Sequence, residues 1–149
     1  MRGGSGEASL TRGDVPWVAG AIVAGGLAGP VLLMFGLARA SAAQSSLLLN
    51  LEGVLTAVLA WVVFREHYNA RTVAGMVAIT LGAVVLTWSG DGRFALDASA
   101  LLVAGACLAW AVDNNLTRVV SSADPVQIAM LKGLAAGGVN VLVAASLGA

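Results

Sequence analysis

The sequence predicts an all-α integral membrane protein with five transmembrane helices. Of its 149 residues, 58% are hydrophobic and only 11% are charged, whereas about 25% of a typical soluble domain is charged. The mean hydropathy is +0.88, and apolar runs near the roughly 20 residues that cross a bilayer as a helix recur along the chain, separated by short polar turns. The predicted spans are residues 15–38, 42–64, 72–89, 98–120 and 125–147.

Charge and rare residues exclude several functional classes. Basic and acidic residues number eight each, so no basic excess is available to neutralise the phosphates of a nucleic acid. Cys107 is the single cysteine and His67 the single histidine, which leaves no internal disulfide and no Cys/His zinc cluster. No Ser/Lys, paired-Asp or metal constellation with catalytic spacing is visible. The sequence therefore predicts neither an enzyme nor a metal or cofactor site.

Residues 1–14 form a Gly/Ser-rich stretch without apolar periodicity, which predicts a loop or disordered cytoplasmic tail. The first span follows over 15–38. Its glycines Gly25 and Gly29 have the four-residue spacing that lets helices approach closely in lipid, and Pro30 predicts a kink. A signal peptide is the alternative, because residues 38–40 resemble a cleavage site, but the apolar run is longer than a usual h-region of about 7–15 residues.

The second span, 42–64, carries Glu52 near its midpoint. A charge at bilayer depth costs roughly 3 kcal/mol or more on insertion scales, so such a residue usually faces a protein interior or a watery cavity. At about 100° per residue, Gln44 and Thr56 fall on the same side as Glu52, as do Ser41 and Ser45. This polar stripe in an apolar helix is typical of the wall of a solute pathway.

The third span, 72–89, follows a polar turn over 65–71. His67 in this turn is expected to be a solvated loop residue, with a proton relay as the less favoured alternative. Gly75 and Gly82 lie on one face and predict helix packing. Trp88 is expected at the membrane interface.

The fourth span, 98–120, follows a loop at 91–97 and has a polar second half. Trp110, Asp113 and Thr117 share one face, and Asn114 with Arg118 is predicted to form an i, i+4 pair beside it. Two interpretations remain open. These polar groups only satisfy one another at the end of the helix, or Asp113 and the neighbouring asparagines line a pathway.

The last span, 125–147, begins with Asp124 as N-cap and a proline at the first helical position. Lys132 and Asn140 lie on nearly the same face, with Gly133 and Gly137 beside them for close packing. Lys132 either snorkels to the interface, or pairs with Glu52 or Asp113, or touches a substrate. The candidate pathway residues are Glu52, Gln44, Thr56, Trp110, Asp113, Asn114 and Lys132, and we expect Glu52, Asp113 and Lys132 to share one interior.

Arginine positions predict the orientation. Five alternating spans place Arg2, Arg12, Arg65, Arg71 and Arg118 on one side and only Arg39 and Arg93 on the other. Because loops rich in Lys and Arg stay in the cytoplasm, the sequence predicts a multi-pass protein of the cytoplasmic (inner) membrane with a cytoplasmic N-terminus.

Two segments resemble a known family. The run from Ala42 to Gly90 begins with small residues, continues as LLLNLE and AVLAWVVF, turns at a charged RE pair and ends in a Gly-rich apolar helix. It resembles the end of an EamA domain of the drug/metabolite transporter superfamily. Residues 101–147, which include CLAWAVDNNLTRVV, resemble the first two helices of a second EamA repeat. The resemblance implies a ten-helix fold of two inverted five-helix repeats, with the pathway between them near the midplane.

On that plan, residues 15–90 supply the last three helices of the first repeat and residues 98–149 the first two of the second. The chain is then expected to be a part of a transporter that moves small metabolites or drugs by alternating access, as an exporter. Its partners are the lipid bilayer, a small-molecule substrate, and either further copies or the missing helices. Expressed alone, the chain is expected to insert without catalysing flux. The alternative is a non-transporting membrane assembly module or a truncated inactive product.

Overall fold

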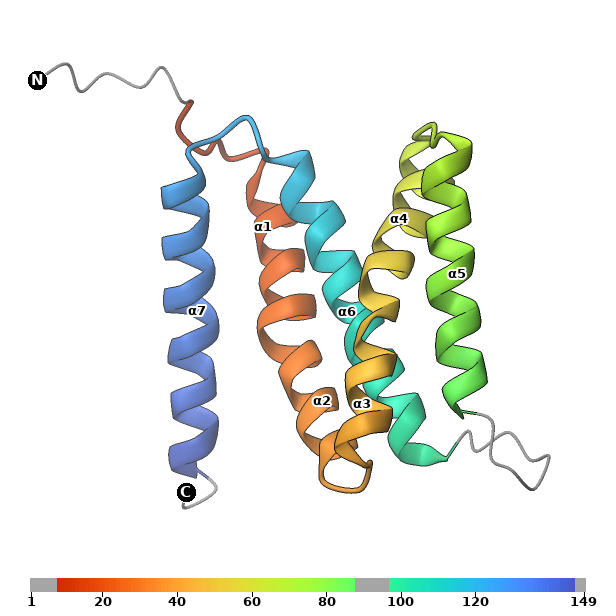
Figure 1. The fold of residues 1–149 in the computed structure, drawn as a ribbon. Coiled ribbons are helices and arrows are strands. Elements are labelled where there is room, and N and C mark those ends of the chain that lie inside the picture. Colours follow the sequence, from red (N-terminus) through yellow and green to blue (C-terminus); the bar gives the residue numbers. More distant parts are fainter. Residues whose placement is uncertain (1–7, 88–96, 147–149) are drawn as a thin grey trace, which may run out of the picture.

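The computed structural model describes residues 8–87 and 97–146, and these fold into helices joined by short connections (Figure 1). In chain order the helices are α1 (Val15–Ala21), the π-helical segment η1 (Ile22–Ala28), α2 (Gly29–Leu37), α3 (Ala42–Leu49), α4 (Leu51–Phe64), α5 (Ala70–Thr87), α6 (Ala98–Val119) and α7 (Pro125–Ser146). Within the described ranges the only β-type pairing is an isolated bridge between Ala8 and Ala123. The prediction of an all-α protein is confirmed.

Helix α6 is the centre of the arrangement. It packs against α1, η1 and α2 on one side and against α3 and α4 on the other, while α5 lies outside α3 and α4. Helix α7 lies beside η1 and α1 at the opposite flank (Figure 1). The backbones of α6 and α7 do not pack against each other among the described residues. Successive long helical segments run in opposite directions (Figure 1), as helices that repeatedly cross a membrane must.

Four of these segments are long and apolar enough to cross a membrane: Val15–Leu37, Gln44–Phe64, Ala98–Val119 and Pro125–Ser146. They correspond to four of the five predicted spans. Helix α5 covers most of the remaining prediction at 72–89, but its apolar stretch over Ala70–Gly82 is shorter. Trp88, at the end of that prediction, lies outside the described residues.

The first span is not a single α-helix with a simple kink. Its middle third, η1, is π-helical, and the N–H of Gly29 bonds to the carbonyl oxygen of Ala24, five residues back. Pro30 follows directly and has no N–H to offer the preceding turn. The helix therefore accommodates the proline with a wide π-helical turn on its N-terminal side, and such turns often occur at functional positions.

The second span is interrupted, contrary to the prediction of one helix over 42–64. Asn50 separates α3 from α4, and its side-chain amide donates to the carbonyl oxygen of Ser46 at 2.9 Å. Asparagine side chains compete in this way for backbone groups that would otherwise continue a helix. As a consequence, Glu52 lies in the first turn of α4 rather than at mid-helix.

Residues 8–14, the described part of the N-terminal tail, form a loop before α1, which is one of the two alternatives that the sequence predicts. The N–H of Asp124 donates to the carbonyl oxygen of Ala8 at 3.1 Å. The N–H of Leu10 donates to Oε1 of Gln127 at 3.0 Å. These bonds tie residues 8–10 to the start of α7, an anchoring that no local pattern in the tail indicates.

Glycines mark where helices touch. A Cβ added at Gly25 would lie 1.9 Å from Oδ2 of Asp113, and one at Gly29 would lie 2.6 Å from Nε1 of Trp110. The predicted close approach at this glycine pair is thus confirmed, with α6 as the partner. Added Cβ atoms at Gly75, Gly82, Gly133 and Gly137 would meet nothing within 4 Å, so the packing predicted at those four positions is not found in the described structure.

Candidate functional site

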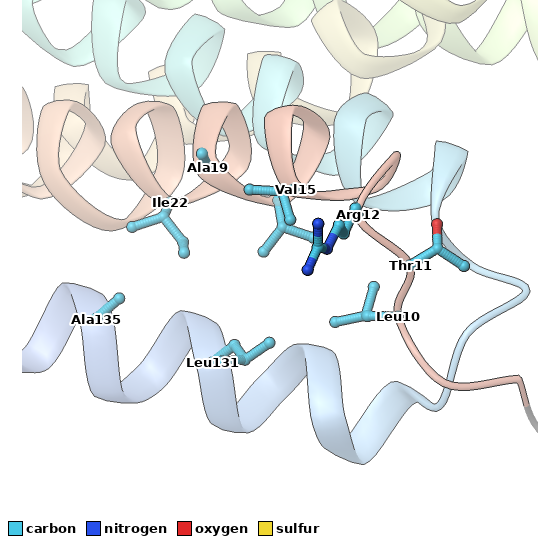
Figure 2. Close-up of a pocket in the computed structure, with 9 residues that line it drawn as sticks. Leu10, Thr11, Arg12, Val15, Ala19, Ile22, Leu131 and Ala135 are labelled. Carbon is cyan, nitrogen blue, oxygen red and sulfur yellow. The ribbon is translucent and has the colours of Figure 1, made fainter.

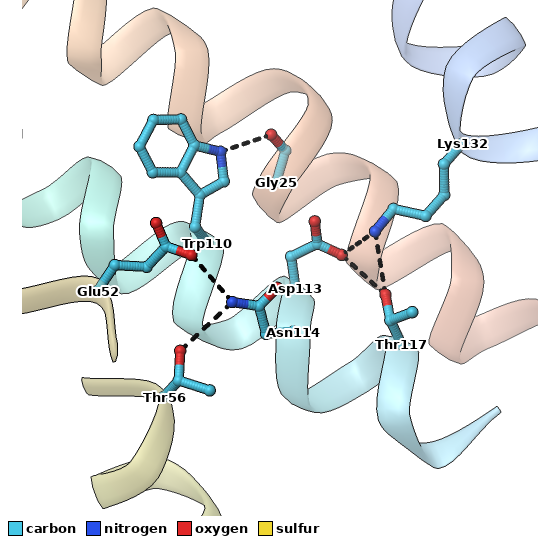
Figure 3. A network of polar contacts seen from close by, with 8 residues as sticks. All are labelled: Gly25, Glu52, Thr56, Trp110, Asp113, Asn114, Thr117 and Lys132. Atoms are coloured by element: carbon cyan, nitrogen blue, oxygen red, sulfur yellow. Dashed lines mark hydrogen bonds and ion pairs between the residues drawn. The ribbon is translucent and has the colours of Figure 1, made fainter. Parts of the chain in front are cut away.

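Asp113 and Lys132 form an ion pair between α6 and α7. Lys132 Nζ lies 2.5 Å from Oδ1 of Asp113 and donates to Oγ1 of Thr117 at 3.0 Å. Thr117 in turn donates to Oδ1 of Asp113 at 3.0 Å, so the three side chains form a closed ring of polar contacts (Figure 3). The Asp113 side chain is 13% exposed and that of Lys132 is 25% exposed. This pairing agrees with one of the alternatives for Lys132 and argues against snorkelling.

The chain builds this ring from simple spacings. Asp113 and Thr117 are four residues apart on one helix, which places them one above the other on the same face. Asp113 can approach the first span because Gly25 has no side chain at the point of contact. Lys132 lies about two turns into α7 and reaches across to α6 with its long side chain, since the two backbones do not touch.

A second network joins α4 to α6. The side-chain amide of Asn114 donates to Oε1 of Glu52 at 3.0 Å and lies 3.4 Å from Oγ1 of Thr56 (Figure 3). Asn115 donates to the carbonyl oxygen of Thr56 at 3.0 Å. Glu52 and Thr56 therefore do share a face, as the helical spacing predicts. However, Glu52 meets Asn114, whereas Asp113 meets Lys132, so the expected single interior is divided into two networks on neighbouring faces of α6.

Asn114 and Arg118 do not pair with each other, contrary to the prediction. Arg118 forms an ion pair with Glu66, and its guanidinium carbon lies 5.6 Å from the centre of the Phe64 ring. The reason is tertiary: α4 packs along α6, and the partners of both side chains come from α4 and the turn that follows it rather than from the neighbouring turn of α6. Sequence spacing on α6 alone cannot reveal them.

The Arg118 pair belongs to a small cluster at the end of α4. The hydroxyl of Tyr68 donates to Oε2 of Glu66 at 3.1 Å. Partial desolvation, together with this hydrogen bond to a carboxylate, raises the pKa of Tyr68 above its ordinary value. His67 lies between them in sequence and is exposed in the turn, as predicted.

Trp110 and Asn140 contact the backbone around the π-helical turn. Trp110 Nε1 donates to the carbonyl oxygen of Gly25 at 3.1 Å, and the Asn140 side chain donates to that of Gly26 at 3.1 Å. Both carbonyls are one turn before Pro30, the residue whose missing N–H would otherwise serve them. Asn140 is not among the candidate pathway residues predicted from the sequence. The sequence signal for it is Pro30, because a proline leaves a carbonyl one turn before it in need of another donor.

A cleft of about 690 Å³ opens between α4, α6 and α7 beside these networks. Its lining is contributed by Thr56, Asn114, Thr117, Arg118, Ser121, Ala123, Pro125, Ile128, Ala129 and Lys132. Three of the candidate residues, Thr56, Asn114 and Lys132, thus lie on its wall. Gln44 does not: it is in the first turn of α3, where its N–H donates to Oγ of Ser41 at 3.2 Å. No group of three metal-binding side chains occurs within the described ranges.

Comparison with known proteins identifies the chain. The sequence profile of the EamA-like transporter family matches residues 4–88, more than half of the chain. The chain belongs to the EamA-like transporter family. An uncharacterized transporter of Methanothermobacter thermautotrophicus is 30% identical to this EamA-like protein over 152 residues, covering 99% of the chain and 44% of the relative. The chain thus spans less than half the length of this curated relative. No solved structure matches it.

Proposed function

We propose that this EamA-like protein forms part of a carrier that moves small polar metabolites across the cytoplasmic membrane by alternating access, in the export direction. Family membership and a relative named as a transporter support transport as the general activity. The cleft between α4, α6 and α7 supplies a place for the solute. The observation that carries the proposal is the side chain of Lys132, which bridges α7 to α6 at the wall of this cleft.

The ion pair of Lys132 with Asp113 is suited to switch between a formed and a broken state during transport. An ion pair with little exposure inside an apolar span is costly unless it is well bonded, and the Asp113–Thr117 ring provides that bonding. Helices α6 and α7 are joined here through side chains rather than through backbone packing. A solute or a proton that competes for Asp113 or Lys132 would therefore change how α7 is held against α6, which is the kind of rearrangement that alternating access needs.

The chemistry of the lining favours solutes with acceptor oxygens. Lys132 has three N–H donors and uses two on Asp113 and Thr117. Arg118, Asn114 and the hydroxyl groups of the lining add further donors, while the lining includes no Asp or Glu. We therefore expect a small metabolite that carries a carboxylate, such as an amino acid, rather than a cationic drug.

The complete carrier is proposed to contain ten helices in two inverted repeats. On this plan residues 15–90 are the last three helices of the first repeat, with α5 as the fifth helix, and residues 98–149 are the first two helices of the second. Large apolar side chains on α7 support further helix or lipid contacts on its outer face, among them Leu134 at 71% exposure and Leu142 at 70%. The start of α1, the end of α4, the start of α5 and the end of α6 lie at one end of the bundle (Figure 1). The N-terminus is proposed to be cytoplasmic because Arg12, Arg65, Arg71 and Arg118 belong to or adjoin these helix ends.

The test is solute flux in liposomes that contain the full-length product of the gene, with the 149-residue chain reconstituted in parallel. The probes are radiolabelled amino acids, with ethidium as the cationic comparison. We expect saturable amino-acid flux from the full-length product, strongly reduced by Lys132→Gln and by Glu52→Gln but not by the matched change Glu66→Gln in the turn.

Two results would contradict parts of this proposal. Flux that is equally reduced by Glu52→Gln and Glu66→Gln would remove Glu52 from the pathway. Saturable flux by the 149-residue chain alone would mean that copies of this chain complete the pathway between themselves. A non-transporting assembly role, favoured by the broad exposed face of α7, predicts no flux for any probe and loss of complex formation when that face is changed.

A further inference from the structure

A second cavity lies away from the cleft, between α1 and α7 at the end of the bundle that holds the N-terminal segment. It measures about 370 Å³, within the range of roughly 300–1,000 Å³ for small-ligand sites. Its walls are apolar except at the mouth, where Thr11 and Arg12 lie. We call this cavity the N-terminal groove.

The groove has the shape of a channel along the helices. Val15, Val18, Ala19 and Ile22 follow the i, i+3, i+4, i+7 pattern of one helix face, and Leu131 and Ala135 face them from α7 (Figure 2). Seven residues at 1.5 Å per residue give a wall about 10 Å long. The groove closes toward η1, where the helices meet: an added Cβ at Gly26 would lie 2.6 Å from Cβ of Ala136.

Arg12 is held at the open end of this wall. The hydrogen bonds from Leu10 to Gln127 and from Asp124 to Ala8 fix the segment before α1 against the start of α7. The Arg12 side chain extends into the gap between the two helices (Figure 2). It forms no ion pair with any described residue. The nearest carboxylate in sequence, Asp14, instead accepts hydrogen bonds from the N–H and hydroxyl of Thr11 at 2.8 and 2.7 Å.

We propose that the N-terminal groove binds one anionic phospholipid, with an acyl chain between α1 and α7 and the phosphate on Arg12. An apolar wall by itself selects no lipid, because acyl chains are as apolar as the leucine side chains they replace. The Arg12 guanidinium, which pairs with no described carboxylate, adds the selection at the mouth, since a guanidinium binds phosphate oxygens in a bidentate manner. Basic sites between transmembrane helices recognise anionic headgroups in this way.

The site would link lipid composition to the position of α7. Helix α7 contacts the rest of the bundle mainly through η1 and through the side chains of Lys132 and Asn140. The lipid would contact Leu131, the residue directly before Lys132 in the sequence. Lys132 forms the ion pair with Asp113, so a contact at Leu131 would act on α7 beside that pair. The inference does not depend on the identity of the transported solute.

The experiment is native mass spectrometry of the 149-residue chain purified with equimolar dioleoyl phosphatidylglycerol and dioleoyl phosphatidylcholine. We expect one retained phosphatidylglycerol per chain, and a fall of about fivefold in its preference over phosphatidylcholine in Arg12→Gln. Arg71→Gln, which removes an exposed arginine at the same end of the bundle, is the matched control and should leave the preference unchanged. Arg12→Lys should restore part of it.

A second variant tests the apolar part. Ala135→Trp should fill the groove and abolish retention of the lipid, while Ala144→Trp, at the exposed far end of α7, should not.

Equal losses in Arg12→Gln and Arg71→Gln would overturn the proposal in favour of general surface attraction. Undiminished retention in Ala135→Trp would place the lipid elsewhere, and displacement of the lipid by inorganic phosphate would reduce the site to a headgroup contact. If the chain instead forms a dimer that retains no lipid, and Ala135→Trp dissociates this dimer, the groove would bind a second copy of the chain.

Discussion

The indole Nε1 of Trp110 donates a hydrogen bond to the backbone carbonyl oxygen of Gly25, 3.1 Å away on a different helix. The same indole lies so close to Gly29 that a Cβ there would be 2.6 Å from Nε1. Gly25 and Gly29 bracket the turn that precedes Pro30, so one side chain both fills the glycine notch and satisfies a carbonyl that the proline leaves without its donor. Trp110 thereby fixes a π-helical turn next to Asp113.

Replacing this donor should destabilise the bundle, and the loss should be larger while the proline is present. Trp110→Phe removes the N–H and keeps an aromatic ring, and hydrogen bonds between transmembrane helices contribute about 0.6 kcal/mol on average and up to about 1.7. We expect a loss in that range, measured as the free energy of unfolding in detergent. Trp61→Phe, at a 53% exposed position, is the control.

The proline can be tested in the same series. Pro30→Ala restores a backbone N–H that can serve the carbonyls one turn back, so the cost of Trp110→Phe should shrink in the Pro30→Ala background. An unchanged cost in both backgrounds would show that Trp110 acts by packing alone.

Gly25→Ala should disrupt the Asp113 site. The new Cβ would lie 1.9 Å from Oδ2 and 2.6 Å from Cβ of Asp113, and forced overpacking usually costs about 1–3 kcal/mol. Gly133→Ala, where nothing lies within 4 Å, should instead be neutral or stabilising by about 0.5–1 kcal/mol because alanine favours helices. Thermal unfolding of the two variants in the same detergent makes the comparison. Equal stability of both variants would mean that α6 and η1 do not meet as described.

Composition and apolar runs were sufficient to predict the class and four of the spans, because hydrocarbon imposes long apolar helices on any chain that crosses it. Local spacing also placed Asp113 with Thr117 and Glu52 with Thr56 correctly. It could not predict the partners of Asn114 and Arg118, since these come from α4 and the turn that follows it, more than 50 residues away. The break at Asn50 could not be predicted for a different reason. A single asparagine does not alter the apolar pattern of the run, although its side chain competes for a backbone carbonyl group.

Asp97 predicts a pH dependence at the start of α6. Its Oδ1 accepts the N–H of Ala100 at 2.8 Å and the hydroxyl of Ser99 at 2.7 Å, and these bonds, chiefly the backbone one, lower the pKa of Asp97. A carboxyl with a lowered folded-state pKa contributes stability above its unfolded pKa of about 3.9 and loses that contribution as pH falls through the folded value.

We therefore expect this N-cap to stabilise the protein fully at pH 5 and above and to weaken progressively below about pH 4. Asp97→Asn keeps an oxygen acceptor that does not titrate, so its unfolding midpoint should fall less steeply between pH 5 and pH 3 than that of the unmodified chain. Parallel curves for the two proteins over this range would exclude Asp97 as the titrating group.

The Asp113–Lys132 pair should show the asymmetry of a poorly exposed ion pair. Removing one partner leaves the other charge without compensation, at a cost of about 3–5 kcal/mol, whereas removing both can be nearly neutral. Lys132→Met and Asp113→Asn should each destabilise strongly, and the double variant should recover most of that loss. The measurement is the free energy of unfolding in detergent or bilayer for the four proteins of the cycle.

The Arg118–Glu66 pair provides the contrast within the same bundle. Its side chains are 44% and 36% exposed, and exposed ion pairs contribute only about 0–1 kcal/mol and are screened by salt. The cycle of Arg118→Met with Glu66→Gln should therefore give a small coupling that high salt removes, while the coupling of Asp113 with Lys132 should be larger and persist in salt. If Lys132→Met costs no more than Arg118→Met, water must reach Asp113 freely, and the pair would not be the fixed link between α6 and α7 on which its proposed role in transport depends.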